Sequence, residues 1–109
     1  MAAYLLNYDA TRIAAMHAQL VGFVKENRNV KQWIHPYAGL FLLKSDADVW
    51  TLAASFRSFF TDANSHVVVP LNSGYFQGIM PNYVWTWLNQ PDQTPISGLL
   101  GYLQNQEIE

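Results

Sequence analysis

The chain of 109 residues contains no cysteine. This absence excludes a disulfide framework and a thiolate metal site, so thiol chemistry does not indicate a compartment. Charge is also scarce, because charged residues make up only 13% of the chain. Six Lys and Arg against eight Asp and Glu give a net charge of −2, which argues against strong, sequence-independent binding of nucleic acid. Nucleic acid as a partner would depend on a local basic patch of Arg12, Arg28 and Lys31.

Long apolar runs are missing as well. No run approaches the roughly 18 residues of a membrane-spanning helix, and the N-terminus lacks the basic start and the cleavage site of a signal peptide. We therefore expect a cytoplasmic protein with no membrane partner. Apolar residues nevertheless make up 50% and aromatic residues 15% of the chain. With so little charge to cover one small domain, we expect a homodimer that buries part of this aromatic surface.

The first half of the chain predicts a strand, a helix and a hairpin. Residues 3–8 are apolar on both faces, as in a central strand, and a helical pattern starts at Thr11. Two β-rich runs, 30–37 and 39–44, flank a turn that contains proline and glycine. The segment 45–48 resembles a capping box and predicts the start of a second helix that ends near residues 62–64.

The second half completes the pattern. Residues 66–71 predict a last strand, and Pro70 places it at a sheet edge because proline cannot donate to a ladder. The order β-α-β-β-α-β predicts an α+β, ferredoxin-like sandwich over residues 1–90, with a short aromatic helix at residues 81–88. Residues 91–109 are expected to form a C-terminal extension with a short helix that docks on a partner subunit.

Four segments, YLLNYDATR, WIHPYAGLFLLKSD, DANSHVVVPL and GIMPNYVWTWL, resemble the SinR-like family of small proteins. That family is similar to the CRISPR-associated protein two family, whose members are ferredoxin-fold homodimers and include metal-dependent nucleases. The resemblance matches Asp9 to the aspartate that ends the first strand in those proteins. It therefore implies that Asp9 is a catalytic residue and a ligand of Mg²⁺ or Mn²⁺.

The position of Asp9 in the sequence is compatible with two roles. A carboxylate at the end of a strand binds a hard cation if a second carboxylate is near, and the chain offers none close in sequence, so such a site requires dimerisation. Alternatively, the Asp9 carboxylate caps the following helix by accepting backbone N–H bonds from Thr11 or Arg12. We favour capping as its sole role.

The histidines and tryptophans give weaker signals. His17, His35 and His66 are too dispersed for a zinc spacing, and His17 lies on an apolar helix face, where a partly buried residue is expected. His35, which precedes Pro36 at the hairpin, is the one histidine that we would test as an acid or base. The aromatic residues from 75 to 87 have no basic neighbours, which favours core or interface packing over stacking on bases.

Two hypotheses of function follow. The preferred one is a non-catalytic dimeric module that binds or assembles with another macromolecule and needs no certain cofactor. The alternative is a metal-dependent nuclease that uses paired Asp9 residues with Mg²⁺ or Mn²⁺, so that the sequence leaves open whether the protein is an enzyme. A third, a small-molecule sensor, would need a polar pocket at the dimer seam.

Overall fold

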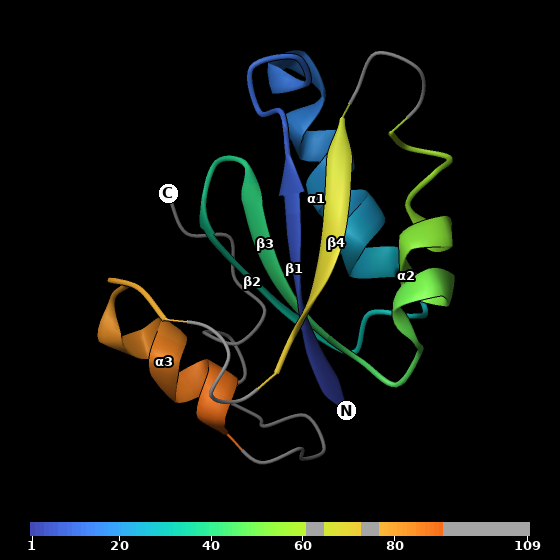
Figure 1. Ribbon diagram of the computed structural model, residues 1–109. Helices are drawn as coiled ribbons and strands as arrows, with labels where there is room; N and C mark the ends of the chain where they lie inside the picture. The colour runs from blue at the N-terminus through green and yellow to red at the C-terminus, as the bar shows by residue number, and fades with distance from the viewer. Residues whose placement is uncertain (61–64, 73–76, 91–109) are drawn as a thin grey trace.

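The computed structural model describes residues 1–60, 65–72 and 77–90, which form one antiparallel sheet with helices on both faces (Figure 1). The predicted extension, residues 91–109, lies outside the described part. The elements are, in chain order, β1 (Ala2–Tyr8), the 3-10 helix η1 (Ala14–Met16), α1 (His17–Glu26), β2 (Gln32–Tyr37), β3 (Leu40–Ser45), α2 (Val49–Ser55), β4 (His66–Leu71) and α3 (Asn82–Asn89). Within the described residues, no helix has the length and apolar composition that crossing a membrane requires.

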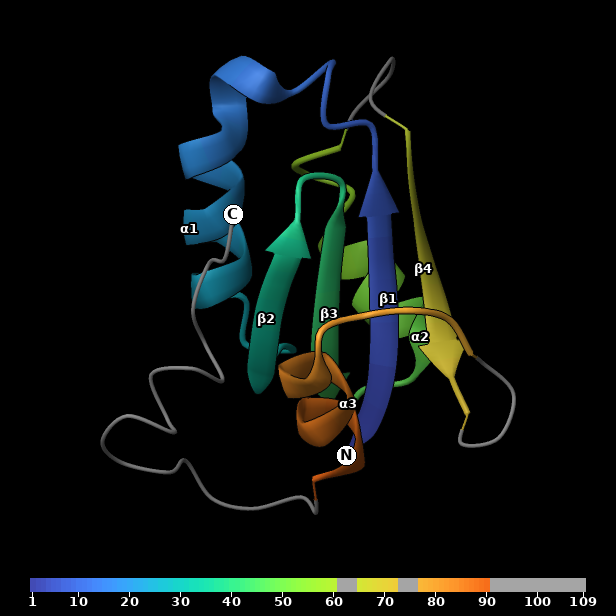
Figure 2. The same cartoon turned by 90° about the vertical axis from the view of Figure 1, so that its left-hand side faces the viewer.

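The strand order is β2-β3-β1-β4, and each neighbouring pair is antiparallel. This confirms the predicted α+β class, and the order is compatible with a ferredoxin-like arrangement. Because β1 and β2 are both antiparallel to β3, they run parallel to each other, and their carboxyl ends lie at the same end of the sheet (Figure 2). β4 lies at an edge, where Pro70 had placed it.

The β2–β3 hairpin is also as predicted. It turns through Ala38 and Gly39, and Gly39 has a φ of +94°, a conformation that side chains disfavour. A Cβ there would lie 3.3 Å from the carbonyl oxygen of Tyr8, so glycine also permits the close approach of the hairpin to the end of β1. The turn at the carboxyl end of β2 therefore lies beside the carboxyl end of β1.

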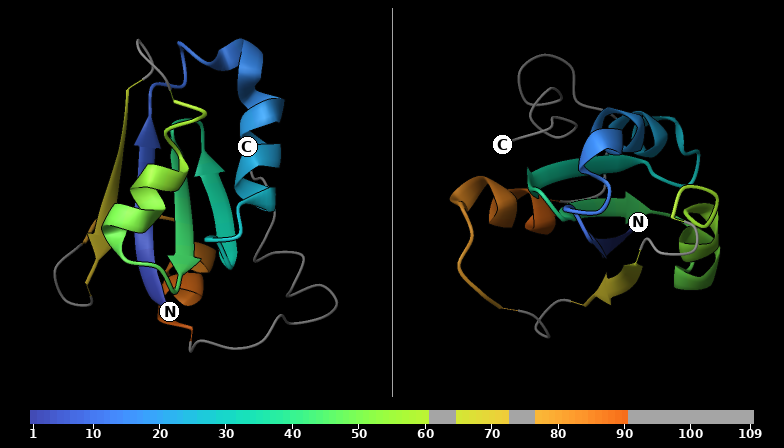
Figure 3. Two further views of the ribbon diagram at one scale, coloured as in Figure 1. Left: turned by 90° about the vertical axis from the view of Figure 1, so that its right-hand side faces the viewer. Right: turned by 90° about the horizontal axis from the view of Figure 1, so that it is seen from above.

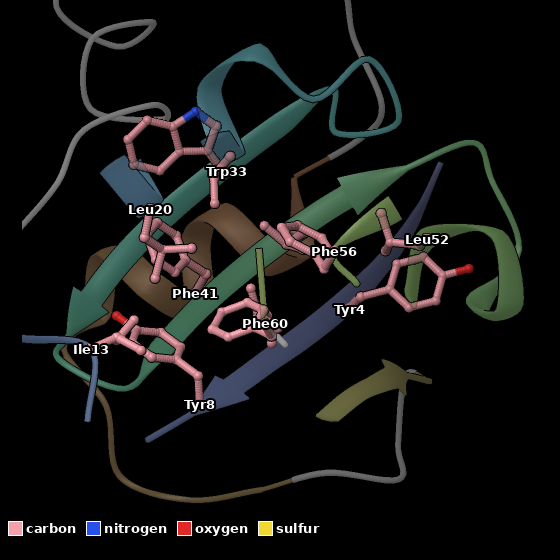
Figure 4. Close-up of a cluster of buried hydrophobic side chains, with 12 residues drawn as sticks. Tyr4, Tyr8, Ile13, Leu20, Trp33, Phe41, Leu52, Phe56 and Phe60 are labelled. Carbon is pink, nitrogen blue, oxygen red and sulfur yellow. The ribbon is translucent and has the colours of Figure 1, made fainter. Parts of the chain in front are cut away.

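Helices α1 and α2 cover one face of the sheet and α3 lies against the other (Figures 2 and 3). The larger core lies under α1 and α2 and is dominated by aromatic rings (Figure 4). Its buried residues are Tyr4, Leu6, Tyr8, Ile13, Leu20, Val24, Trp33, Phe41, Leu43, Leu52, Phe56 and Phe60. The alternation of these residues with Leu5, Ile34, Leu40 and Leu42 on the other face explains why the inner strands are apolar throughout.

A buried lysine joins α3 to the second face of the sheet. Lys44, in β3, is only 2% exposed, and its Nζ donates to the carbonyl oxygens of Trp87 at 2.6 Å and Gln90 at 3.3 Å. The same ammonium group lies 4.6 Å from the centroid of the Trp87 ring. A cation at the C-terminus of a helix satisfies carbonyl groups that have no partner within the helix. Lys44 therefore acts as the C-terminal cap of α3.

Both predicted helices on the first face are shorter than expected. The first begins as an α-helix only at His17, because Ile13 and Met16 have backbone angles outside the helical region. The second ends at Ser55, whose hydroxyl donates to the carbonyl of Leu52, and the chain continues in turns. The cap of α2 is Asp48, which accepts the N–H of Thr51 at 2.7 Å, and not Ser45 as the capping-box pattern had indicated.

Candidate functional site

Asp9 follows β1 directly and is exposed. Its Oδ1 accepts the backbone N–H groups of Thr11 at 3.1 Å and Arg12 at 3.2 Å, as the capping hypothesis predicted. Its Oδ2 lies 3.7 Å from Nε of Arg12. These bonds close a turn that precedes η1, however, and α1 begins eight residues after Asp9. The carboxylate is therefore held by its own local turn, and whether this is its only role stays a prediction.

A metal role for Asp9 has little local support. Over residues 1–60, 65–72 and 77–90, no group of three or more His, Asp or Glu side chains is placed to hold a metal ion. Asp46 and Asp48, the acids nearest to the start of the second helix, lie at the other end of β3 from the Gly39 turn that meets Tyr8. Within the part of the chain that the structure describes, these two acids therefore do not join Asp9 in a two-carboxylate site.

The structure brings together two histidines that the sequence separates. His17 is the first residue of α1 and His35 lies in β2, yet their ring centroids are 5.3 Å apart. From the sequence, the histidines were judged too dispersed for a zinc spacing. His66 lies elsewhere, at the start of β4, with its ring stacked on Phe60 at 4.6 Å. Burial and, to a lesser extent, Arg57 lower the pKa of His66.

The His35 ring is fixed in position. It is completely buried and stacks on Phe41 with a centroid separation of 4.1 Å and an interplanar angle of 14°. Its Nδ1 lies 2.8 Å from the carbonyl oxygen of Leu40. Because a carbonyl oxygen only accepts, Nδ1 carries the proton in this bond, and in the neutral ring Nε2 carries the lone pair. Nε2 of His35 is buried within the protein as well.

A cavity of about 300 Å³ opens beside His17, and His35 does not line it. It lies at the carboxyl end of β1, and its lining residues are Tyr8, Ala10, Ile13, Ala14, His17 and Ala38. The Tyr8 ring is also 6.4 Å from the His35 ring. Two imidazoles and a phenol therefore meet at the end of the sheet where Asp9 also lies, which sequence spacing alone did not indicate.

The free edge of β4 is a second candidate site. Among the described residues its only strand neighbour is β1. Large apolar side chains are exposed around it: Val67 is 50% and Val69 40% exposed, and Trp50 of α2 is 80% exposed. Trp50 and Arg57 line a hollow of about 360 Å³ whose other wall is formed by the start of β4.

The register of β4 shows which of its backbone groups face outward. The N–H of Asp9 donates to the carbonyl of Ser65, directly opposite in the β1–β4 register, so this is a hydrogen-bonded pair. Hydrogen-bonded and non-hydrogen-bonded pairs alternate along an antiparallel ladder. His66, Val68 and Pro70 therefore direct their backbone N–H and carbonyl groups away from β1. Pro70 has no N–H, but no bond between β4 and β1 is lost by this, because the backbone of residue 70 faces outward.

Neither a protein family model, nor a curated protein, nor a solved structure matches this chain. The function has therefore to be argued from the geometry of the described residues.

Proposed function

We propose that this chain is a non-catalytic, ferredoxin-like module for binding or assembly, and that it works as a homodimer joined along β4. The observation that supports it best is the free edge of β4, whose outward backbone groups are self-complementary. The cytoplasmic location and the relation to the SinR-like family stay predictions from the sequence.

The outward pattern of β4 permits an antiparallel pair with a two-fold axis at Val68. In that arrangement the N–H of Val68 donates to the carbonyl of Val68 of the partner subunit. The N–H of His66 donates to the carbonyl of Pro70 of the partner subunit, and symmetry repeats each bond. Pro70 has no N–H to return, so the pairing is weaker at its ends than at its centre. The result is one continuous sheet across both subunits.

The apolar residues beside the edge support the same interface. Val67 and Val69 are exposed on the face that α3 occupies, whereas Trp50 is exposed beside β4 on the face of α2. An edge strand flanked by apolar side chains on both sides is a template for pairing with another chain. The low charge of the chain, 13% of its residues, leaves few groups that would oppose such pairing.

This dimer has a consequence for Asp9. Asp9 lies opposite Ser65, three residues from Val68 along the strand. With about 3.4 Å per residue along the strands and about 4.8 Å between strands, the two Asp9 positions would be roughly 25 Å apart. One ion could not bridge them. The nuclease alternative with paired Asp9 residues therefore needs a different dimer from the one proposed.

Light scattering coupled to size-exclusion chromatography tests the proposal. We expect a mass of about 25 kDa, twice the 12.4 kDa of one chain. Val68→Pro removes the central outward N–H without removing a bond to β1, and should shift the mass toward the monomer.

The matched variant is Pro70→Val, which restores the missing outward donor and should tighten the dimer. Circular dichroism verifies that each variant is folded. A monomeric wild type at all concentrations, or a folded Val68→Pro variant with an unchanged dimer constant, would contradict the edge dimer. If Val68→Pro does not fold, Pro70→Val still decides, because an unchanged or weaker dimer there contradicts the pairing.

A further inference from the structure

The hollow beside β4 contains polar side chains that pairing along β4 does not use. It has a volume of about 360 Å³ and lies between α2 and the start of β4, which are neighbours in the fold (Figure 1). Trp50, Ala53 and Arg57 line one wall, and their spacing of three and four residues places them on one side of α2 and of the turn that continues it. The small side chain of Ala53 leaves space between the two long ones. The hollow therefore has an aromatic ring at one end of this wall and a cation at the other.

Trp50 provides a flat apolar surface at the hollow. It is 80% exposed, although tryptophan is among the side chains that are highly buried on average. Among the described residues, no aromatic ring stacks on the Trp50 indole. Nucleobases stack on such rings, and every base does so because every base has a π-face. The exposed indole is therefore suited to a planar aromatic ligand.

Two basic side chains make the same hollow suitable for an anion. Arg57 is exposed and forms no ion pair with an acid among the described residues, and no acid is among the described residues that line the hollow. His66 lines the hollow from β4, and burial and then the charge of Arg57 lower its pKa. Arg57 is thus close enough to act on His66, and an anion between them would favour the charged form of both. Phosphate is such an anion, and a guanidinium group binds it through two parallel hydrogen bonds.

We propose that this hollow binds a free nucleotide, with its base stacked on Trp50 and its phosphate held by Arg57 and His66. The volume of about 360 Å³ lies within the range of small-ligand sites. The other lining residues are apolar: Val49, Ala53, Val67 and Val68. Their side chains cannot form hydrogen bonds with the edge of a base, so stacking alone holds the base and different bases are accepted.

A free nucleotide fits the hollow better than a nucleic-acid strand. A strand is held by cations that follow its backbone from one nucleotide to the next. This hollow has one arginine and one histidine, and the net charge of the chain is −2. The site is also complete within one chain, so it goes beyond the proposed dimer and does not depend on it.

Titration of tag-free protein with AMP, followed by NMR and by tryptophan fluorescence, tests the site. We expect one AMP per chain with a Kd of about 0.1–1 mM, because one stacked base and one bound phosphate make few contacts. Adenosine and inorganic phosphate each lack one of these parts, and each should bind at least about tenfold more weakly. UMP should bind within about tenfold of AMP, and an oligoadenylate should bind no more tightly per nucleotide than AMP.

Variants of the two walls identify the site. Arg57→Gln and Trp50→Ala should each weaken AMP binding by about tenfold or more, whereas Trp50→Phe keeps a ring and should lose less. Arg28→Gln is the matched control, since Arg28 is exposed and does not line the hollow, and it should bind AMP as the wild type does. Circular dichroism verifies that the variants are folded, which is expected because the three side chains are exposed.

The possible results separate this site from the dimer. The proposal is wrong if AMP does not bind the wild type at about 10 mM, or if a folded Arg57→Gln or Trp50→Ala variant binds it unchanged. An oligoadenylate that binds more than about a hundredfold more tightly than AMP would show that the ligand is a strand and not a free nucleotide. A monomeric protein that binds one AMP per chain would contradict the edge dimer and support the nucleotide site.

Discussion

Lys44→Met tests whether the buried ammonium group attaches α3 to the sheet. Methionine keeps an unbranched apolar side chain of similar length, so the substitution removes the charge and the donors while most of the packing remains. The carbonyl oxygens of Trp87 and Gln90 would lose the bonds from Lys44 at 2.6 Å and 3.3 Å, and Trp87 would keep the longer bond of 3.4 Å from the N–H of Gln90. The apolar cluster of Ile34, Leu40, Leu42, Val84 and Trp87 would stay in place.

Three contributions determine how much Lys44→Met changes the free energy of unfolding. A hydrogen bond from a charged donor contributes about 1.5–3 kcal/mol, and the contact of Lys44 with the Trp87 ring about 0.5–2 kcal/mol. Against these stands the cost of burying the charge, which is real here because burial lowers the pKa of Lys44. We expect a net loss of about 2 kcal/mol, which for a domain of this size lowers the melting temperature by roughly 8–16 °C.

Thermal and urea melts of the two proteins measure this loss, and hydrogen exchange locates it. Amide protons of α3 should exchange faster in Lys44→Met than in the wild type. The exchange rates of β1 amide protons should rise less than those of α3. Lys31→Met is the matched control, because Lys31 is exposed and the same substitution there should change stability by less than about 0.5 kcal/mol. Equal or higher stability of Lys44→Met would refute the reasoning, and would mean that desolvation outweighs the bonds to α3.

Two more predictions concern Asp9 and His66. Asp9→Asn should keep stability within a few tenths of a kcal/mol, whereas Asp9→Ala should cost about 0.5–2 kcal/mol, because asparagine caps as well as aspartate. A manganese-dependent rise in the wild-type melting temperature that vanishes in Asp9→Asn would instead favour the metal-dependent alternative. The pKa of His66 is lowered from 6.5, so the unfolded chain binds the proton more tightly, and stability should fall as pH drops from 6.5 through the folded pKa. His66→Phe keeps the stack on Phe60 and should flatten that slope in melts across the same range; an unchanged slope would assign it to another group.

The positions of the strands could be predicted from the sequence, whereas the ends of the helices could not. Apolar runs locate β1, β2 and β3 because these strands bury most of the residues that make the run, whereas the run of β4 is apolar although Val67 and Val69 are exposed. Helical periodicity, in contrast, reports burial and not an unbroken helix. Ile13 is 2% exposed although it precedes η1, and Phe60 is 5% exposed although α2 ends at Ser55. Turns bury these two side chains as fully as a longer helix would. The apolar pattern in the sequence therefore extends beyond the ends of both helices.

Lys44 shows a different limit of the sequence. A lysine at the end of an apolar run is usually a solvated strand end, and nothing near residue 44 indicates that a helix more than forty residues later covers it. Its partners are backbone carbonyls, which every helix has, so no complementary residue marks the contact in advance. Such a cap becomes visible only when the packing of α3 is known.

The histidine pair, by comparison, follows from the topology once the element order is accepted. In a β-α-β unit the first residues of the helix lie near the carboxyl end of the first strand, and the second strand ends at that same end because it runs parallel to the first. His17 begins α1 and His35 lies in the second half of β2, so the order of elements alone places them at one end of the sheet. The spacing of the histidines along the chain did not indicate their contact, because a spacing pattern compares residues within one local segment. A search by end of the sheet groups Tyr8, Asp9, His17 and His35, and the contacts of the structure then separate Asp9, held by its turn, from the pair of imidazoles.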